Sequence, residues 1–469
     1  EAIARGQQRV LVVMATGTGK TFTAFQIIHR LHKSGSKKKI LYLADRNILI
    51  DQTMVQDFKP FKKFMTKITS VGEGEEKIDS SYEVYMALYH QLVGKEGKPD
   101  PFLEVQPNFF DLIIVDECHR GSAKDDSAWR KVLEYFSSAT QIGMTATPKA
   151  DEGANNLDYF GEPVYTYSLL QGIQDGFLAP YRVTADFINV DLQGWTPEEG
   201  ETDLLGKEIE QKLYQRQNIG RDLAIKLRRK VVAHRITQML QDIGRMTKTI
   251  VFCSDIEEAA EMRTLLINMN SDLCKKSPYY VTRIVGEDKE GKKQLDNFIS
   301  VDEPYPVIVT TSELSTGVDC KTCGLIVIDK EIGSMTEFKQ IIGRGTRLRK
   351  DKGKWHLEIL DFRNATAKFK DPAFDGNPEP PKGGGKKPKP YKIIDAPETP
   401  IVSEHREKYL ISGKNIRIAH EIVSVLGEDG KTMRTESVQS FAKKQLLRHY
   451  QTLDDFIQTW TEAERKQAI

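Results

Sequence analysis

Cysteine is scarce in this sequence, with only five residues among 469. Five thiols spread over a chain of this length do not form a disulfide framework, and they fit a reducing cytoplasm. Long apolar runs are also missing, because none approaches the ~20 residues that a membrane-spanning helix needs. The first residues show neither a secretory pattern nor a starting methionine. We therefore expect a cytoplasmic protein without membrane contact, whose sequence begins inside a longer one.

An excess of charge of one sign is absent as well. Lysine and arginine together number 68 and the acidic residues 67, which leaves a net charge of +1. Such a balance neither favours nor excludes nucleic acid as a partner. Cys320 and Cys323 have the spacing of half a zinc site, but no second pair accompanies them. We interpret them as small loop residues before a strand.

Short apolar runs alternate with amphipathic stretches and predict an α/β fold. In residues 1–180 the expected strands are Val10–Met14, Ile40–Ala44, Leu112–Val115 and Gln141–Met144. In residues 181–365 they are Thr249–Cys253, Tyr280–Val285, Pro306–Thr310, Gly324–Asp329 and Leu357–Asp361. Strands that alternate with helical segments indicate parallel sheets covered by helices. We therefore expect one lobe in residues 1–180 and a second in residues 181–365.

Charged and proline-rich segments complete the predicted organisation. Residues 208–243 suit one or two helices, and the cluster Arg228–Lys230 within them is more typical of a solvated helix face than of a phosphate contact. Residues 366–400 are rich in proline, glycine and lysine and predict a linker. Residues 401–469 predict a small helical domain, with helices at 437–450 and 453–464.

A glycine-rich loop between an apolar strand and a helix is the most specific motif, and it spans Ala15–Thr21. Its two glycines let backbone N–H groups face phosphate oxygens. Lys20 then places a charge on the β- and γ-phosphates, and Thr21 offers a hydroxyl to Mg²⁺. Met14 stands where the general phosphate loop has its first glycine, which favours the helicase variant of the loop. The residues expected to bind nucleotide here are Thr16, Gly17, Thr18, Gly19, Lys20 and Thr21.

Two carboxylates follow the expected strand at 112–115. Asp116 would hold Mg²⁺ through water, and Glu117 would polarise the attacking water as a general base. His119 would link the nucleotide site to the next motif, although a lone histidine is more often structural. Thr145 and Thr147 follow another strand, and their hydroxyls would report the state of the nucleotide to the Asp-Glu pair.

The second half of the chain carries two further motifs. Ser315 and Thr316 would bond phosphates of a nucleic-acid strand, and Gly317 would permit a close approach. Gln340–Arg347 contains two arginines, Arg344 and Arg347, which would share one face of a helix. A guanidinium supplied across a cleft stabilises the charge on a transferred phosphoryl group.

Taken in order, these motifs resemble those of superfamily 2 helicases and translocases, over about residues 1–365. The resemblance implies two RecA-like lobes that bind ATP with Mg²⁺ between them and nucleic acid across both. It adds Gly317 and Asp319 to the nucleotide contacts, and gives Gln340, Arg344 and Arg347 catalytic roles beside Glu117.

Shorter stretches are similar to the R subunits of type I restriction enzymes, namely Asp116–Ser122, Tyr159–Tyr165, Asp175–Pro180 and Leu453–Trp460. This resemblance implies a motor that pulls duplex DNA through a complex with methyltransferase (M) and specificity (S) subunits. No counterpart of that family's nuclease motif is visible in the chain. A stand-alone helicase and a nucleic-acid-sensing ATP switch remain as alternatives, and neither is excluded by the sequence.

Overall fold

The computed structural model describes residues 1–44, 58–68, 78–93, 100–118, 125–146, 156–219, 222–286, 289–312, 320–369, 409–413, 416–426 and 433–436. Two compact units divide the chain. The first comprises Glu1–Leu178 with Ile342–Arg344, and the second comprises Ala179–Ile341 with Gly345–Ile469. No helix within the described ranges is both long and apolar enough to cross a membrane.

The first unit is built on a seven-stranded parallel sheet with the order β3-β4-β2-β5-β6-β1-β7. Its strands are β1 (Arg9–Met14), β2 (Ile40–Ala44), β3 (Met65–Lys67), β4 (Val84–Leu88), β5 (Leu112–Asp116), β6 (Thr140–Thr145) and β7 (Tyr165–Tyr167). Its helices are α1 (Lys20–Lys33), α3 (Tyr89–Leu92), α4 (Asp125–Tyr135), α5 (Asn156–Phe160) and α6 (Leu169–Gln174). The short 3-10 turns are η1 (Ile3–Arg5), η2 (Lys59–Phe61) and η3 (Pro101–Glu104). All four strands expected from the sequence are present.

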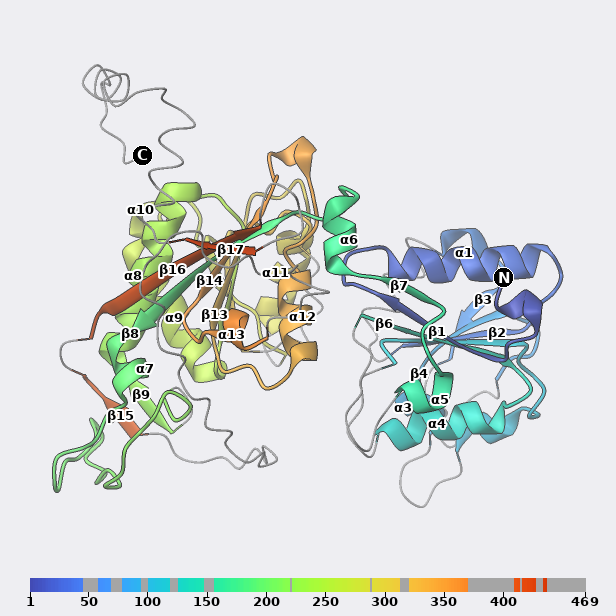
Figure 1. The fold of residues 1–469 in the computed structure, drawn as a ribbon, viewed down its shortest axis with the longest axis horizontal. Coiled ribbons are helices and arrows are strands. Elements are labelled where there is room, and N and C mark those ends of the chain that lie inside the picture. Colours follow the sequence, from blue (N-terminus) through green and yellow to red (C-terminus); the bar gives the residue numbers. More distant parts are fainter. Residues whose placement is uncertain are drawn as a thin grey trace. The chain divides into compact units, whose positions relative to one another are not determined.

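Strand β1 contributes to two hydrophobic clusters, one on each face of this sheet. Val10, Val12 and Met14 pack with α1, whereas Leu11 and Val13 pack in the cluster that contains the end of α4. Successive side chains of a strand point to opposite faces, so a strand covered on both sides is apolar throughout. Figure 1 shows α1 on one side of the sheet and α4 on the other. The sheet is therefore buried between two helical layers.

The second unit contains an eight-stranded sheet with the order β11-β12-β10-β13-β14-β8-β16-β17. Its strands are β8 (Tyr181–Ile188), β10 (Thr249–Cys253), β11 (Val281–Arg283), β12 (Ile308–Thr311), β13 (Leu325–Asp329), β14 (Leu357–Asp361), β16 (Ile418–Leu426) and β17 (Met433–Glu436). A two-stranded sheet pairs β9 (Leu223–Ile225) with β15 (Tyr409–Ile411). The five strands expected from the sequence are all present and parallel to their neighbours, and the antiparallel pairs involve only β16.

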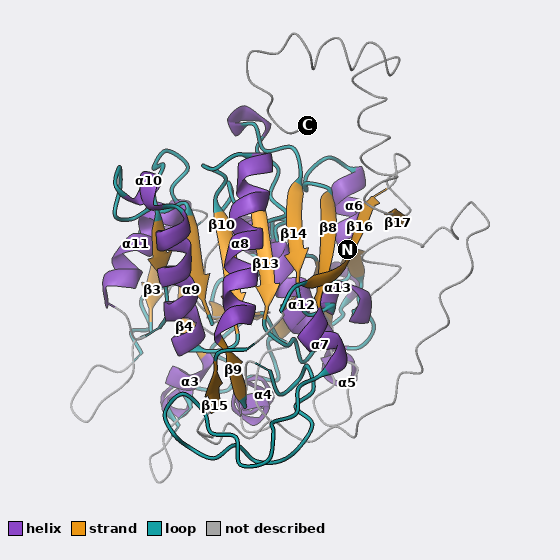
Figure 2. Cartoon of the chain, turned by 90° about the vertical axis from the view of Figure 1, so that its left-hand side faces the viewer, coloured by secondary structure: helices purple, strands orange, loops and turns teal. Residues whose placement is uncertain are grey.

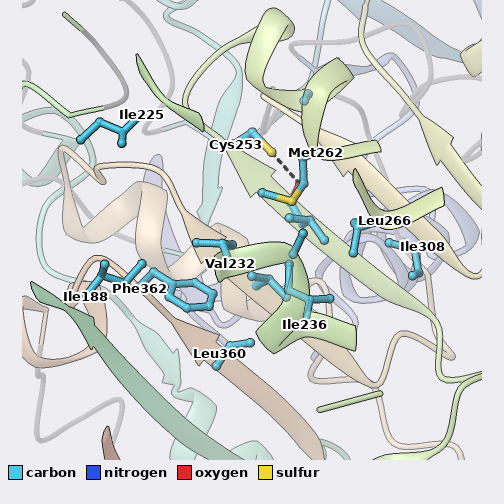
Figure 3. Close-up of a cluster of buried hydrophobic side chains, with 14 of the residues drawn as sticks. Ile188, Ile225, Val232, Ile236, Cys253, Met262, Leu266, Ile308, Leu360 and Phe362 are labelled. Carbon is cyan, nitrogen blue, oxygen red and sulfur yellow. Dashed lines mark hydrogen bonds between the residues drawn. The ribbon is translucent and has the colours of Figure 1, made fainter. Parts of the chain in front are cut away.

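Helices of the second unit cover both faces of its larger sheet. They are α7 (Asn189–Gln193), α8 (Lys226–Ile243), α9 (Ile256–Met269), α10 (Ser271–Cys274), α11 (Lys289–Ile299), α12 (Met335–Gly343) and α13 (Ala365–Lys368), with a 3-10 turn η5 (Lys350–Lys352). Helices α8 and α9 lie side by side over one face (Figure 2). The core beneath them joins Val232 and Ile236 of α8 to Met262 of α9 and to sheet residues such as Leu360 (Figure 3).

The segment after residue 400 differs from its prediction. We expected a helical domain in residues 401–469, but every described element there is a strand: β15, β16 and β17. Strand β16 pairs antiparallel with β8 and extends the sheet of the second unit. Its residues Ile418, Ile422, Val423 and Val425 are β-branched, a composition that favours a strand, and β8 offers it a free edge. The helices expected at 437–450 and 453–464 lie outside the described residues, as does most of the linker expected at 366–400. Only residues 366–369 of that linker are described, and Thr366–Lys368 belong to a short helix, α13.

In the cluster Arg228–Lys230, predicted to face solvent, Lys230 is exposed as expected, but the prediction was wrong for Arg228 and Arg229. Arg228 is 1% exposed and donates to both carboxylate oxygens of Asp191 and to both of Asp329. Arg229 is buried as well and forms ion pairs with Glu258 and Glu261. These two arginines therefore hold α8 against neighbouring elements instead of facing solvent or phosphate. A buried charge survives only when it is paired in this way.

Candidate functional site

Three strands of the first unit end together and place the predicted residues at one edge of the sheet. Strand β6 lies between β1 and β5, with Val13 opposite Thr145 and Asp116 opposite Met144. Because all three strands are parallel, the loop after β1, the acidic pair after β5 and Thr145 at the end of β6 meet at the carboxyl edge. This edge is where ligands bind in open parallel α/β sheets.

The loop between β1 and α1 has the conformation that phosphate binding requires. Gly17 and Gly19 adopt φ values of 88° and 90°, which residues with a Cβ rarely adopt. The Thr18 hydroxyl donates to the Ala15 carbonyl at 2.6 Å and closes the loop. Lys20 and Thr21 are the first two residues of the 14-residue helix α1. The first N–H groups of a helix have no partner within the helix, so this loop and helix start offer the donors that an anion site needs.

Lys20 contacts the acidic pair directly. Its Nζ lies 3.1 Å from Oε1 of Glu117, and the two side chains are only 9% and 18% exposed. Glu117 has a φ of 49°, in the left-handed region that costs free energy for a residue with a side chain. Strain of this kind persists only where the surroundings impose it, and it gathers at functional sites. The fold thus holds the Glu117 carboxylate beside the phosphate loop.

Asp116 is held by two hydrogen bonds. Its Oδ2 accepts from the hydroxyl of Tyr42 at 2.6 Å, and its Oδ1 accepts from the N–H of Glu117 at 2.9 Å. Burial and the neighbouring Glu117 carboxylate raise the pKa of Asp116, and Lys20 and Tyr42 offset only part of that rise. A bound cation would favour the ionised form of Asp116. Carboxylate and hydroxyl oxygens are the ligands that Mg²⁺ prefers, so Asp116 and Thr21 fit the metal.

Of the remaining predicted residues, Thr145 lies at the same edge, and most of the others fall outside the described part of the chain. Thr145 is fully buried at the end of β6. His119, Thr147, Ser315, Thr316, Gly317 and Asp319 lie outside the described residues. Cys320 and Cys323 are buried free thiols in the loop before β13, as expected.

The two arginines of the Gln340–Arg347 motif differ from the prediction in one respect. Gln340 lies on α12, but that helix ends at Gly343, so Arg344 and Arg347 follow it in a turn and an extended segment. They do not share a helix face. Glycine is a poor helix former, and two glycines, Gly343 and Gly345, flank Arg344.

Sequence reasoning missed Tyr42, which the structure brings to the site. The side chain lies on β2, where Tyr42 pairs with Ile114 of β5, two residues before Asp116. Residues two apart on a strand share a face. A tyrosine within the apolar run Ile40–Ala44 was the available signal, because a buried phenol needs a hydrogen-bond partner.

Comparison with known proteins agrees with these features. Residues 1–150 match the family model "Type III restriction enzyme, res subunit", and residues 232–349 match "Helicase conserved C-terminal domain". The chain is 48% identical over its whole length to the type I restriction enzyme EcoAI endonuclease subunit of Escherichia coli, and spans 62% of that protein. It is 29% identical over 77% of its length to the EcoKI endonuclease subunit of Escherichia coli K12, and spans 33% of that protein.

Solved structures give the same result. A fragment of an HsdR subunit of a type I restriction enzyme from Vibrio vulnificus YJ016 is 42% identical, with a TM-score of 0.64, over 81% of this chain and 64% of that one. The type ISP restriction-modification enzyme LlaBIII shares the fold. It is 20% identical, with a TM-score of 0.51, over 76% of this chain and 26% of that one. The chain thus has two RecA-like lobes that form a superfamily 2 helicase core, and it belongs to the family of type I restriction enzyme endonuclease (HsdR) subunits.

Proposed function

We propose that this chain is the ATP-driven translocase motor of a type I restriction enzyme and moves along double-stranded DNA. The observation that carries the proposal is the arrangement of Lys20, Asp116 and Glu117 at one sheet edge, beside a phosphate loop of the helicase type. The family membership supports the restriction context. The relatives are longer than this chain, so the activity of the whole protein is part of the proposal.

The first unit supplies the groups for hydrolysis. Lys20 and the N–H groups at the start of α1 bind the β- and γ-phosphates, assisted by Thr16–Gly19. Thr21 and Asp116 would hold Mg²⁺, which neutralises charge that develops on the phosphate oxygens. Glu117 accepts a proton from water as the water oxygen attacks the γ-phosphorus. The bond from that phosphorus to the bridging oxygen breaks, and ADP and phosphate leave.

The second lobe, residues 181–365, would complete the reaction and couple it to DNA. Arg344 and Arg347 stabilise negative charge on the transferred phosphoryl group, and Gln340 orients the reactants. Gly317 and Asp319 contribute to the nucleotide site, and Ser315 and Thr316 bind DNA phosphates. His119, Thr145 and Thr147 relay the state of the nucleotide between the two sites. Contacts to phosphates alone make the motor indifferent to DNA sequence.

The proposed partners are duplex DNA and the M and S subunits of a type I complex in the cytoplasm. The proposed domains are residues 1–180 and 181–365 as the two lobes, 366–400 as a linker and 401–469 as a C-terminal region. Since no nuclease motif is visible in the sequence, we expect the chain to consume ATP and leave DNA uncut. Mg²⁺-dependent cleavage by the chain alone would contradict this.

A triplex-displacement assay tests the proposal. A translocase assembled with its partner subunits releases a third strand bound downstream of the recognition site, only with ATP, and its ATPase activity depends on duplex DNA. Lys20→Ala should abolish both, because it removes the charge that binds phosphate. Unwinding of a tailed duplex without triplex release would instead indicate a helicase. DNA-stimulated ATP hydrolysis with neither movement would indicate a switch.

A further inference from the structure

Tyr42 is the only side chain of β2 with a polar group, in the run Ile-Leu-Tyr-Leu-Ala of residues 40–44. The residue is 1% exposed, and its ring packs against Phe58 at 5.6 Å between centroids. A phenylalanine would satisfy the same packing. The hydroxyl, buried with the ring, needs a hydrogen-bond partner that compensates the loss of water. It donates to Oδ2 of Asp116 at 2.6 Å, the short distance typical of a bond to an ionised acceptor.

The sheet register explains why Tyr42 reaches this carboxylate. Tyr42 lies beside Ile114, and Asp116 is two residues further along the neighbouring strand and on the same face. Two residues of a strand span about 6.6 Å, which is close to the reach of a tyrosine hydroxyl. The other carboxylate oxygen accepts the Glu117 N–H at 2.9 Å. Both oxygens of Asp116 are therefore held, one by backbone and one by Tyr42.

We propose that Tyr42 is a positioning residue for the metal–nucleotide site, acting through Asp116. Each carboxylate oxygen has a further lone pair beyond the one that its hydrogen bond occupies. With the carboxylate plane fixed by two donors, the remaining lone pairs keep fixed directions, as a carboxylate that would bind Mg²⁺ through water requires. This role rests on the proposed ATPase function. It makes Tyr42 an outer partner of the metal ligand, of the kind that orients ligands in many metal sites.

Tyr42→Phe isolates the hydroxyl from the packing. Loss of the donor removes the hydrogen bond to Oδ2 of Asp116, a 7% exposed residue, and leaves the carboxylate held only at Oδ1 by the Glu117 N–H. We expect metal affinity to fall about tenfold, the lower end of what the loss of an outer partner costs. The Mg²⁺ concentration for half-maximal ATP hydrolysis should rise by about the same factor. The rate at saturating Mg²⁺ should stay within about threefold of wild type.

A binding measurement separates this role from turnover. Mn²⁺ binding in the presence of ADP, followed by electron paramagnetic resonance, should weaken about tenfold in Tyr42→Phe. Affinity for ADP in excess chelator should not change, because Lys20 and the loop are intact. In an Asp116→Asn background, Tyr42→Phe should cause no further loss of Mn²⁺ affinity, since its effect passes through that carboxylate.

Tyr85 provides a matched control on the adjacent strand β4. It is fully buried too, and its hydroxyl donates at 2.8 Å to the carbonyls of Asp79 and Tyr82, which belong to the backbone and not to the site. Tyr85→Phe should leave metal affinity unchanged. Wild-type Mn²⁺ affinity in Tyr42→Phe, or an equal loss in Tyr85→Phe, would overturn the assignment. A wild-type chain that binds Mn²⁺ and ADP but never hydrolyses ATP would refute the proposed function and leave the Tyr42 test valid.

Discussion

The ion pair between Lys20 and Glu117 gives Glu117→Gln two separable effects. The Nζ of Lys20, which we propose binds phosphate, lies 3.1 Å from Oε1 of Glu117. The phosphates of a bound nucleotide must displace the Glu117 carboxylate from Lys20, and they are repelled by its negative charge. Glutamine keeps the size of the side chain and removes the charge. The substitution should therefore tighten nucleotide binding while it removes the proton acceptor for hydrolysis.

The size of each effect follows from the geometry. The two side chains are mostly buried, so the pair falls between an exposed ion pair of ~0.5 kcal/mol and a charged hydrogen bond of ~2 kcal/mol. A net gain of about 1.4 kcal/mol corresponds to about tenfold tighter binding. Loss of a general base slows proton transfer by about 10²- to 10⁴-fold. We expect ADP affinity to rise about tenfold and ATP turnover to fall by at least about a hundredfold.

Two measurements on the same preparation of Glu117→Gln test this prediction. Nucleotide affinity is measured by titration with a fluorescent ADP analogue, and turnover by phosphate release with duplex DNA present. Glu134→Gln, on the exposed face of α4, removes one carboxylate from the same unit and serves as the control. Turnover within tenfold of wild type would exclude Glu117 as the base. Weaker ADP binding would show that Lys20 and Glu117 do not compete with the phosphates.

Four further substitutions or conditions test the rest of the account. Arg347→Ala should leave ATP affinity nearly intact and slow hydrolysis about 10³-fold, as the loss of an arginine finger does, and full activity would exclude this role. Arg228→Met should lower the free energy of unfolding, measured with urea, by about 3–5 kcal/mol, because two buried carboxylates lose this partner. A decrease of less than about 1 kcal/mol would contradict the ion-pair network. Burial raises the pKa of Asp186 to about 6 despite Arg235, so near pH 5 the folded chain holds a proton that the unfolded chain has released. The free energy of unfolding should therefore fall as pH rises from about 4 to 6. In Asp186→Asn, the midpoint of urea unfolding should depend less on pH over this range. Binding to DNA should weaken steeply with added salt, and a binding constant independent of salt would exclude phosphate contacts.

The parallel strands were predictable because they are buried on both faces. Runs such as Ile40–Ala44 and Thr249–Cys253 have no polar side to break the pattern, and turn residues mark their ends. Strand β8 was missed, although it joins β14 to β16 in the second sheet. Its sequence Tyr181–Ile188 includes Arg182 and Asp186, whose charges are compensated by Glu358 and Arg235 from distant parts of the chain. A local pattern does not reveal partners that lie so far along the sequence.

The same limit explains the error at α8. A run of Arg228, Arg229 and Lys230 is typical of an exposed helix face, because a buried guanidinium costs several kcal/mol unless it is paired. The carboxylates that pair with Arg228 come from Asp191, before the helix, and Asp329, at the end of β13. Neither aspartate lies three or four residues from Arg228 on the same helix, so a helical spacing could not predict these ion pairs. The phosphate loop, in contrast, was predictable because its chemistry is confined to seven consecutive residues.

Two buried aspartates, Asp191 and Asp116, differ in how completely their charge is compensated. Burial raises the pKa of Asp191, but the guanidiniums of Arg228 and Arg363 bring it below its usual value. The charge of Asp191 is therefore compensated by groups of the chain itself. Asp116 is buried too, yet its pKa stays raised, and Glu117 beside it has a strained backbone. A raised pKa alone does not distinguish a ligand site, because the pKa of Asp186 is also raised although Asp186 forms an ion pair with Arg235. Asp116 differs from Asp186 in that its neighbour Glu117 has a strained backbone and contacts the lysine of a glycine-rich loop. A raised pKa and backbone strain at one point are the combination that we expect of a site for a charged ligand.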